Sequence, residues 1–554
     1  MNLKRIFVLA SLLLLCAGAA AEAISREEAR LKAQAFFAGR PAKSGAPERE
    51  VKLVSEQGRL RIFQRDGGGF VVISSEEAAD AAVLGYSEGG EFRRDNVPPA
   101  MLSWLKALDS HVEACAQRGP DGRAGLKAQE GKLLTTASWS QQSPYNGLCP
   151  ELAPVGCAPL AMGIIMRYYQ WPDAGTGTLE SYSYEDIHKK THSVTGYALG
   201  HKYDWENMPL SGVTKDNASG IPQLLLDCGV MTRAWYSYSD NGTVTFTSKM
   251  LPALKEHMKF DASGMFRYLQ YSDAEEWVAA VAAEIDSSRP VLYCGQDPDT
   301  EEGHAFVVDG YDSESRFHIN WGWGGEQNGY FTFPAFSEYT QSHAAIFGLR
   351  KDEGGTPDAC LLVKSISSAS SVIEKGEEFS VDFEAVNISD CNFKGSVAVG
   401  LLDEQEELVQ TVSEAIPVDS LSFGEGLKAS GVKCTVTEDI KVGDALTLFF
   451  KYGDGQWQQC VYDTSESDSA FIRIADTAHL DAATSMRYDR TVRTVTLVTK
   501  AGAACTVSGG NADTRTEALE DGTLQIEISG LQEGASYTVT LDDGKETFTF
   551  KLLL

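Results

Sequence analysis

The amino-acid sequence predicts a protein of the α+β class that is divided into several domains. The chain has 554 residues, and because a domain usually holds roughly 100–200 residues, we expect several separate cores. Segments with helical and strand periodicity are mixed through residue 352, and only short alternating strands follow. Hydrophobic residues make up 43% and charged residues 23% of the chain, a balance typical of globular proteins.

The first 23 residues have the pattern of an export signal. Two basic residues precede an apolar run from Ile6 to Ala21, which is shorter than the roughly 20 residues of a typical transmembrane helix. Ala21-Glu22-Ala23 then offers a signal-peptidase cleavage site. The alternatives are an uncleaved anchor helix and a lipoprotein signal at Cys16, for which Leu15 is a poor neighbour. We therefore expect an exported protein, secreted, at the cell surface or in the periplasm, with no membrane span.

The charge and the cysteine spacing exclude two classes of ligand. The formal net charge is -30, and because so acidic a surface repels phosphate backbones, we expect no binding of nucleic acid. Eleven cysteines are present, but no two of them form a CxxC pair, so we expect no zinc or other metal site. Export would permit disulfides, and the cysteine spacing leaves their pairing open.

Residues 24–131 form the first predicted module. Ser25 and Glu28 make a capping box ahead of one helix, and a second helix is expected over residues 99–117. Three strand-like runs lie between them, at residues 51–54, 60–63 and 69–73. The polar, Gly-rich stretch over residues 119–131 has the composition of an exposed linker, where proteases commonly cut.

A second module, over residues 132–352, combines a helical part with strands. The helical pattern is clearest from Pro159 to Tyr169. Strands are predicted later, at residues 291–294, 304–311, 316–319, 330–333 and 345–349. Helices followed by strands within one module are typical of an α+β domain.

Two all-β modules are predicted after it. Over residues 357–475, short alternating strands are separated by Gly, Asp and Asn, as at residues 379–383, 396–402 and 446–452. This pattern is typical of an antiparallel, immunoglobulin-like β-sandwich. A smaller β module is expected over residues 480–554, and neither module contains a group of residues with evident catalytic chemistry.

Cys157 and His304 are the candidate nucleophile and base. Cys157 precedes a helix whose first turn accommodates Pro159, and the positive end of a helix dipole favours a thiolate there. Among nine histidines, His304 opens an apolar strand, whose rigid backbone would present the ring to a cleft. A buried structural thiol is the alternative for the cysteine, and His318 lies inside a strand, where we expect it to be packed or exposed.

Two further stretches contain residue types suited to acyl transfer. Gln141, in the turn-rich segment 139–146, has a side-chain amide that would stabilise an oxyanion together with the backbone N–H of Cys157. Residues 320–325 place two tryptophans among glycines, which suits the wall or floor of a cleft. Taken alone, the first stretch reads as a solvated loop and the second as a structural aromatic cluster.

Together these motifs resemble the streptopain family of papain-like cysteine peptidases. The matching stretches, in chain order, are WSQQSPYN (139–146), VGCAPLAMGIIMRYYQWP (155–172), GHAFVVDGYD (303–312) and HINWGWGGEQNGYF (318–331). Four motifs in the right order are more specific than any one of them. GGGFVVISSEEAADAAVLGYSEGGEF (67–92) resembles the propeptide of that family, whereas both β modules lie outside the resemblance.

The resemblance implies a role for each matching residue. Cys157 is expected to be the nucleophile, His304 the general base and acid, and Gln141 part of the oxyanion hole. Trp321, which occupies the place of the asparagine in papain, is expected to orient the histidine. Trp323 is expected to pack as a cover beside it.

Two stretches depart from the pattern of this family. Residues 236–245 contain less Gly and Ser than the substrate-binding loop to which they correspond. Residues 295–303 (GQDPDTEEG) are more acidic than the Gly-rich form of the family, and Gly303 at their end is expected to shape the substrate-binding cleft. Both departures concern substrate preference and leave the chemistry unchanged.

The sequence thus predicts an exported cysteine endopeptidase made as a zymogen. Residues 1–23 would be the signal peptide, 24–131 a propeptide that inhibits the enzyme intramolecularly, and 132–352 the papain-like catalytic domain. The dyad would cleave protein or peptide substrates through an acyl-thioester, with neither a metal nor an organic cofactor. The alternatives are a surface adhesin or binding protein with a vestigial peptidase module, and an acyltransferase that passes the thioester to an amine.

Overall fold

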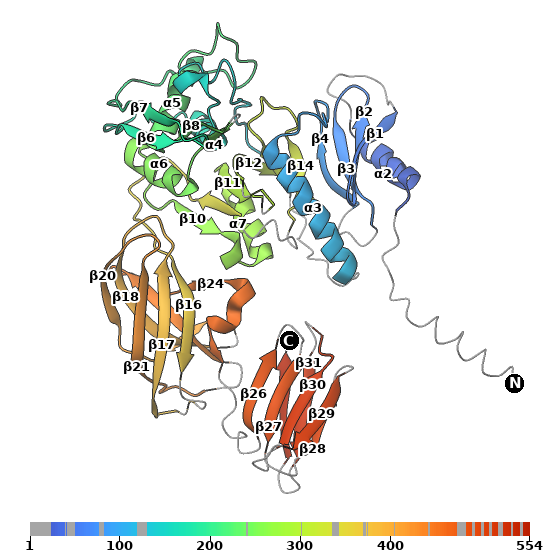
Figure 1. The fold of residues 1–554 in the computed structure, drawn as a ribbon, viewed down its shortest axis with the longest axis vertical. Coiled ribbons are helices and arrows are strands. Elements are labelled where there is room, and N and C mark those ends of the chain that lie inside the picture. Colours follow the sequence, from blue (N-terminus) through green and yellow to red (C-terminus); the bar gives the residue numbers. More distant parts are fainter. Residues whose placement is uncertain are drawn as a thin grey trace, which may run out of the picture.

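The computed structural model describes most of residues 24–553 (Figure 1). Besides the first 23 residues and Leu554, the stretches outside the description are 39, 41–49, 77–81, 119–129, 240–241, 298, 301, 335–342, 369–372, 374, 404, 441–443, 474–482, 490–493, 500–503, 509–511, 519–523, 533–535 and 543–546. The predicted export signal and most of the predicted linker therefore lie outside the described residues. Within the described part, no helix combines the length and the apolar character needed to span a membrane.

The N-terminal segment is a four-stranded meander between two helices. Helix α2 (Arg26–Ala38) begins where the Ser25 hydroxyl accepts the backbone N–H of Glu28 at 3.1 Å, as the capping box predicts. The strands are β1 (Val51–Gln57), β2 (Leu60–Arg65), β3 (Phe70–Ser74) and β4 (Val83–Ser87), each paired with the next. Since alternate residues point to opposite faces, α2 packs on one face and α3 (Pro99–Arg118) on the other.

One sheet continues from this segment into the following part of the chain. Strand β4 pairs with β14 (Gly329–Phe331), and eleven strands form a single sheet. Beyond β14 the path runs through β13 (Phe317–Asn320), β12 (Gly303–Tyr311), β11 (Val291–Gln296), β15 (Ala344–Phe347) and β10 (Met265–Tyr268), with β5 (Lys132–Leu133) paired to β12. The two modules predicted from the sequence therefore share one sheet, and every predicted strand is present.

Helices cover both faces of this sheet, so that β11 and β12 separate two cores. On one face lies α4 (Cys157–Tyr169), with α5 (Ile221–Met231), α6 (Met250–Met258) and two hairpins packed around it. The hairpins are β6 (Tyr182–Glu185) with β7 (Thr191–Val194), and β8 (Trp235–Ser239) with β9 (Gly242–Val244). On the other face, α3 and α7 (Ala274–Asp286) enclose the second core.

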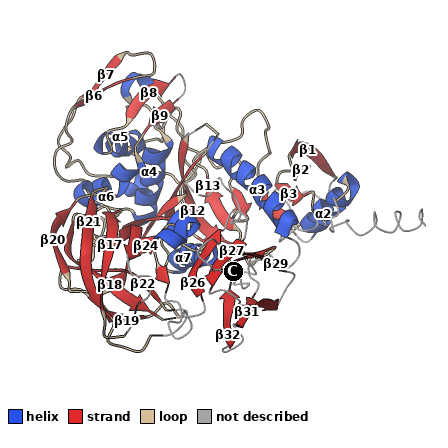
Figure 2. Cartoon of the chain, turned by 60° about the horizontal axis from the view of Figure 1, so that its bottom comes forward, coloured by secondary structure: helices blue, strands red, loops and turns tan. Residues whose placement is uncertain are grey.

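The chain after β15 contains strands and no α-helix in its described part, which Figure 2 shows in red. The first two sheets of this part share one core. The first sheet has β16 (Leu361–Ser368), β17 (Glu378–Asn387), β21 (Gly426–Thr435) and β24 (Val461–Tyr462). The second sheet has β18 (Phe393–Leu402), β19 (Leu408–Thr411), β20 (Ile416–Leu421), β22 (Ala445–Tyr452), β23 (Gln458–Gln459) and β25 (Ile472–Arg473). Two smaller sheets follow: β26 (Ala483–Asp489), β27 (Thr494–Thr499), β29 (Asp513–Ala518) and β30 (Leu524–Ser529), and β28 (Ala504–Ser508), β31 (Ser536–Asp542) and β32 (Thr547–Leu553). The predicted α+β class is confirmed.

None of the ten cysteines among the described residues is joined in a disulfide. Cys228 and Cys460, for example, are fully enclosed in apolar cores, where a thiol packs like a small hydrophobic group. In the described residues, no group of three His, Cys, Asp or Glu side chains is arranged to hold a metal ion.

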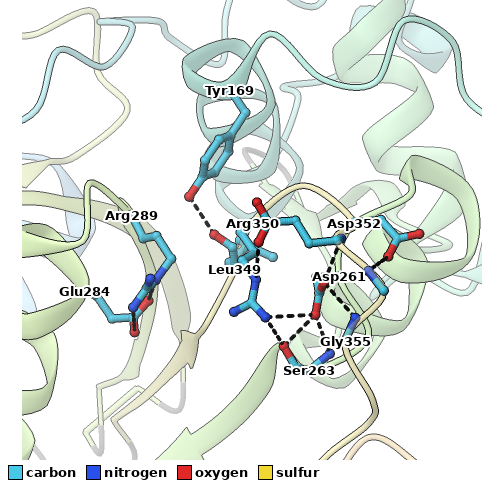
Figure 3. Close-up of polar contacts among 11 residues, drawn as sticks. Tyr169, Asp261, Ser263, Glu284, Arg289, Leu349, Arg350, Asp352 and Gly355 are labelled. Atoms are coloured by element: carbon cyan, nitrogen blue, oxygen red, sulfur yellow. Dashed lines mark hydrogen bonds and ion pairs between the residues drawn. The ribbon is translucent and has the colours of Figure 1, made fainter.

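A buried carboxylate fixes the segment that joins β15 to β16 (Figure 3). Asp261, whose side chain is 0% exposed, accepts hydrogen bonds from the backbone N–H groups of Glu353 at 2.9 Å and Gly355 at 3.1 Å. A Cβ at Gly355 would lie only 2.1 Å from this carboxylate, so the close approach requires glycine. Burial alone would raise the pKa of Asp261, but hydrogen bonds from Ser263, Glu353 and Gly355 outweigh it and hold the pKa well below its usual range.

We expect Asp261→Asn to lower the free energy of unfolding by about 2 kcal/mol at neutral pH, because the amide loses charged hydrogen bonds. A depressed carboxyl pKa stabilises the fold above the unfolded value of about 3.9 and ceases to do so as the pH falls below it. The difference in Tm between wild type and variant should therefore shrink as the pH is lowered toward about 3. Differential scanning calorimetry measures it, with the exposed Asp216→Asn as control; equal Tm values for both variants would contradict the role of Asp261.

Candidate active site

Cys157 occupies the first position of α4. The preceding residue, Gly156, is the N-cap and has a φ of 94°, a conformation that residues with a side chain rarely adopt. Thr243 of β9 lies against this turn, and its hydroxyl donates to the carbonyl of Pro154 at 2.6 Å. The turn and the β8–β9 hairpin thus fix the backbone on which Cys157 is presented.

The thiol of Cys157 lies against the first residues of β12. Burial raises the pKa of this thiol, and the backbone N–H groups of Ala305 and Ala158 oppose the shift as hydrogen-bond donors. Ala305 directly follows His304 in β12, and Cys294 of β11 is its partner across the ladder. The fold therefore brings together two predicted site residues that are far apart in the sequence.

His304 is held at the beginning of β12, opposite Gly295. Burial lowers the pKa of its imidazole, while the carboxylates of Glu302 and Asp297 act in the opposite direction. Strand alternation assigns His304 to the face of Phe306, in the core under α3, whereas Ala305 belongs to the core around α4. In the part of the chain that the structure describes, no hydrogen bond or ion pair joins Cys157 to His304, and the shift of each pKa favours the uncharged form of its group.

Gln141 lies close to the cysteine in the fold. Its carbonyl accepts the backbone N–H of Val155 at 3.0 Å, two residues before Cys157. The neighbouring Trp139 carbonyl accepts the N–H of Gly324 at 2.8 Å. The segment that carries Gln141 therefore lies between the turn before α4 and the Gly-Trp loop.

The predicted tryptophans belong to the core on the His304 face. Trp321 is buried, and its indole N–H donates to the Gln327 carbonyl at 3.0 Å while its ring centroid lies 5.2 Å from that of Phe306. Trp323 is half-buried against the same core. Gly303 is exposed, and a Cβ there would have no neighbour within 4 Å among the described atoms, which leaves open space beside His304.

His318 is in a separate network, as its position within a strand predicts. Its Nδ1 atom pairs with the carboxylate of Asp309, and its ring packs edge-on against Tyr330 with the centroids 4.8 Å apart. These contacts lie on β12–β14, away from the start of β12. His318 is therefore a packed residue and not a partner of Cys157.

Sequence analysis missed the part that helix α3 plays at this site. Trp104 of α3 packs against Trp321 and Phe306, with ring centroids 6.3 Å and 5.9 Å apart. Two residues further along the helix, Lys106 lies 2.8 Å from the carboxylate of Asp297, in the loop before His304. The acidity of that loop is visible in the sequence, but nothing there indicates that a lysine from residues 99–118 would meet it.

Comparison with known proteins relates two stretches of the chain to protein families. Residues 139–331 match the model of the Peptidase C10 family, and residues 21–112 match that of the Spi protease inhibitor. The thiol protease/hemagglutinin PrtT of Porphyromonas gingivalis is 29% identical over 366 residues, which cover 59% of this chain and 41% of PrtT. This chain thus spans about two fifths of that relative's length.

Two further proteins are similar. Streptopain of Streptococcus pyogenes is 28% identical over 307 residues, covering 50% of this chain and 74% of streptopain. A solved fragment of prointerpain A from Prevotella intermedia is 24% identical and covers 56% of this chain and 99% of the fragment, with a TM-score of 0.46. The chain therefore contains a domain of the Peptidase C10 family over residues 139–331, preceded by a segment of the Spi protease inhibitor type.

Proposed function

We propose that this chain is an exported cysteine endopeptidase that is synthesised as a zymogen. The observation that carries the proposal is the placement of Cys157, at the N-terminus of α4, against the residue that follows His304 in β12. In this division, residues 1–23 are the signal peptide, 24–131 the inhibitory propeptide and 132–352 a papain-like catalytic domain. The export signal in the sequence and the secreted character that it implies complete the proposal.

The proposed reaction is acyl transfer through a thioester. In the active form, Cys157 and His304 share a proton as a thiolate–imidazolium pair, and the thiolate attacks the peptide carbonyl. The Gln141 amide and the backbone N–H of Cys157 stabilise the oxyanion. His304 protonates the leaving amine, and water then hydrolyses the thioester. Trp321 orients the imidazole, Trp323 covers it, and Gly303 leaves room for the substrate.

Latency follows from the state of the two groups in the full chain. Burial raises the pKa of the Cys157 thiol and lowers that of the His304 imidazole, and both shifts disfavour the thiolate–imidazolium pair that the reaction needs. Helix α3 occupies the His304 face through Trp104 and holds the 297–299 loop through Lys106. Release of residues 24–131 would remove both restraints, and the predicted linker before residue 132 is the segment where cleavage would permit it.

The two C-terminal parts are proposed to be accessory β modules. The shared core of the sheets formed by residues 361–473 supports an immunoglobulin-like sandwich over residues 357–475. Residues 480–554 would form a smaller module around the core that β27, β30 and β31 share. The candidate site draws all its residues from residues 139–323, so the chemistry does not depend on side chains of these modules.

Cys157→Ala and His304→Ala are each expected to reduce hydrolysis of a quenched fluorescent peptide by at least about a thousandfold, because each removes one half of the dyad. The measurement uses chains matured by a second protease that cuts within residues 119–131, so that failure to self-activate does not confuse the result. His257→Ala, which alters a half-buried histidine of α6 whose Nδ1 lies 3.1 Å from the Thr176 carbonyl, is the control and should retain full activity. Turnover by Cys157→Ala at the rate of the control would overturn the assignment.

The reactivity of Cys157 should change with maturation. Burial raises the pKa of this thiol in the full chain, so alkylation by iodoacetamide should be slow at neutral pH and accelerate only at alkaline pH. After loss of residues 24–131 the imidazolium stabilises the thiolate, and we expect alkylation near pH 6.5 to become at least about tenfold faster. Peptide mass spectrometry measures both rates, with Cys505 as the internal reference; an equal Cys157 rate before and after maturation would contradict the latent dyad.

Lys106→Met should speed the autolytic loss of the N-terminal segment by about three- to tenfold. The variant removes an ion pair whose two side chains are 26% and 6% exposed, and such a partly buried pair contributes about 1 kcal/mol to docking of the segment. Electrophoresis of samples taken over time gives the rate. Lys32→Met, which removes one positive charge from α2 without losing an ion pair, is the control, and equal rates in both variants would argue against the latch.

A further inference from the structure

In the loop before His304, backbone hydrogen bonds fix the positions of the acidic residues that the structure describes. Asp297 donates its backbone N–H to the carbonyl of Glu302 at 3.0 Å, and its own carboxylate accepts the backbone N–H of Asp299 at 2.9 Å. These bonds close the loop directly before Gly303 and His304. The carboxylates of Glu302 and Asp297 act on the His304 imidazole, so the loop lies beside the candidate site.

A lysine from another element is seated in this loop. The ammonium of Lys106 lies 2.8 Å from Asp297 and 3.1 Å from Asp299, and the Ser103 hydroxyl donates to Asp297 at 3.2 Å. The Asp297 side chain is 6% exposed and that of Asp299 is 58% exposed, so one carboxylate is enclosed and the other opens to solvent. Lys106 and Ser103 both belong to α3, which the proposed maturation removes.

We propose that in the mature enzyme this loop, through Asp297 and Asp299, binds a lysine or arginine side chain of the polypeptide substrate next to the scissile bond. Lys106 is then the internal stand-in for that side chain in the zymogen. The proposal rests on the proposed function and extends it to substrate preference. The observation that supports the proposed binding site is the ammonium group of Lys106 between the two carboxylates; the acidity of the loop alone would not suffice.

Burial and charge favour a basic side chain as the occupant. In the full chain the burial of Asp297 would raise its carboxyl pKa, but the hydrogen bond from Lys106 and the other donors outweigh it and hold the pKa below its usual value. Loss of α3 removes the cation from this carboxylate, and a basic side chain of the substrate would replace the lost charge. Exposed Gly303 leaves the neighbouring space open for a peptide backbone, and opposite charge across such a contact discriminates between substrates.

The test compares three quenched fluorescent peptides that differ at one position next to the scissile bond, which carries Lys, Ala or Glu in turn. The full chain is folded, allowed to mature and assayed at low ionic strength. Two such sets of three peptides are used: in one the varied residue precedes the scissile bond, and in the other it follows the bond. We expect kcat/KM for the Lys peptide to exceed that for the Glu peptide by about tenfold on one side, and the preference to fall in high salt.

Asp297→Asn and Asp299→Asn keep the size of each side chain and remove its charge. The readout is the Lys-to-Glu ratio within one variant, which divides out any effect on folding or on His304. Because Asp299 is largely exposed, its variant is expected to fold even if the other does not. Glu206→Gln, an exposed acid of the helical part, is the control for overall charge and should keep the wild-type ratio.

Each outcome decides the proposal. A wild-type preference for Lys that either aspartate variant reduces at least threefold, and that Glu206→Gln retains, supports it. Cleavage of the Ala peptide without a Lys preference on either side, or a preference that both aspartate variants retain, overturns the binding site and means that the loop serves only to hold α3. Failure of the matured wild type to cleave any of the peptides overturns the proposed function, and the binding site with it.

Discussion

The pairing of β4 with β14 is the contact on which the arrangement of the site depends. It joins Tyr86 to Tyr330 across the ladder, with their rings stacked 5.0 Å apart, and the Ser87 hydroxyl donates to the Asn328 carbonyl at 2.6 Å. Because strand pairing fixes position along the strands and the face of every side chain, this one ladder sets where α3 lies relative to β12. The contacts of Trp104 and Lys106 with the site are consequences of that register.

Strand β12 then divides the site between two cores. Its residues alternate, so Ala305 packs with α4 while Phe306 packs with α3 and the tryptophan of the Gly-Trp loop. Cys157 therefore lies on one side of the strand and His304 on the other. The N-terminal segment fills the core on the His304 side with Trp104, so under the proposed function it would control the dyad without altering α4.

The sequence predicts the local elements well and the long-range contacts poorly. The Ser25–Glu28 cap, the helix after Cys157 and the strand after His304 were predictable because each depends on residues a few positions apart. Motif order brought Cys157, His304 and Gln141 into one hypothesis, and the fold places the three segments together. The meeting of Lys106 with Asp297, and of Asp261 with Gly355, is not encoded in any periodicity, since each joins segments that only the completed fold brings together.

The same contacts explain how a single cleavage could change the state of the enzyme. While the linker is intact, the N-terminal segment is held by its covalent tether, so even modest contacts keep it docked at a high effective concentration. Cleavage makes its dissociation bimolecular, and the docked state must then depend on the β4–β14 ladder, on Trp104 and on the Lys106 ion pair alone. A protein or peptide with a basic side chain at the loop would compete for the last of these contacts. Substrate would then both occupy the site and oppose rebinding of the segment that had closed it.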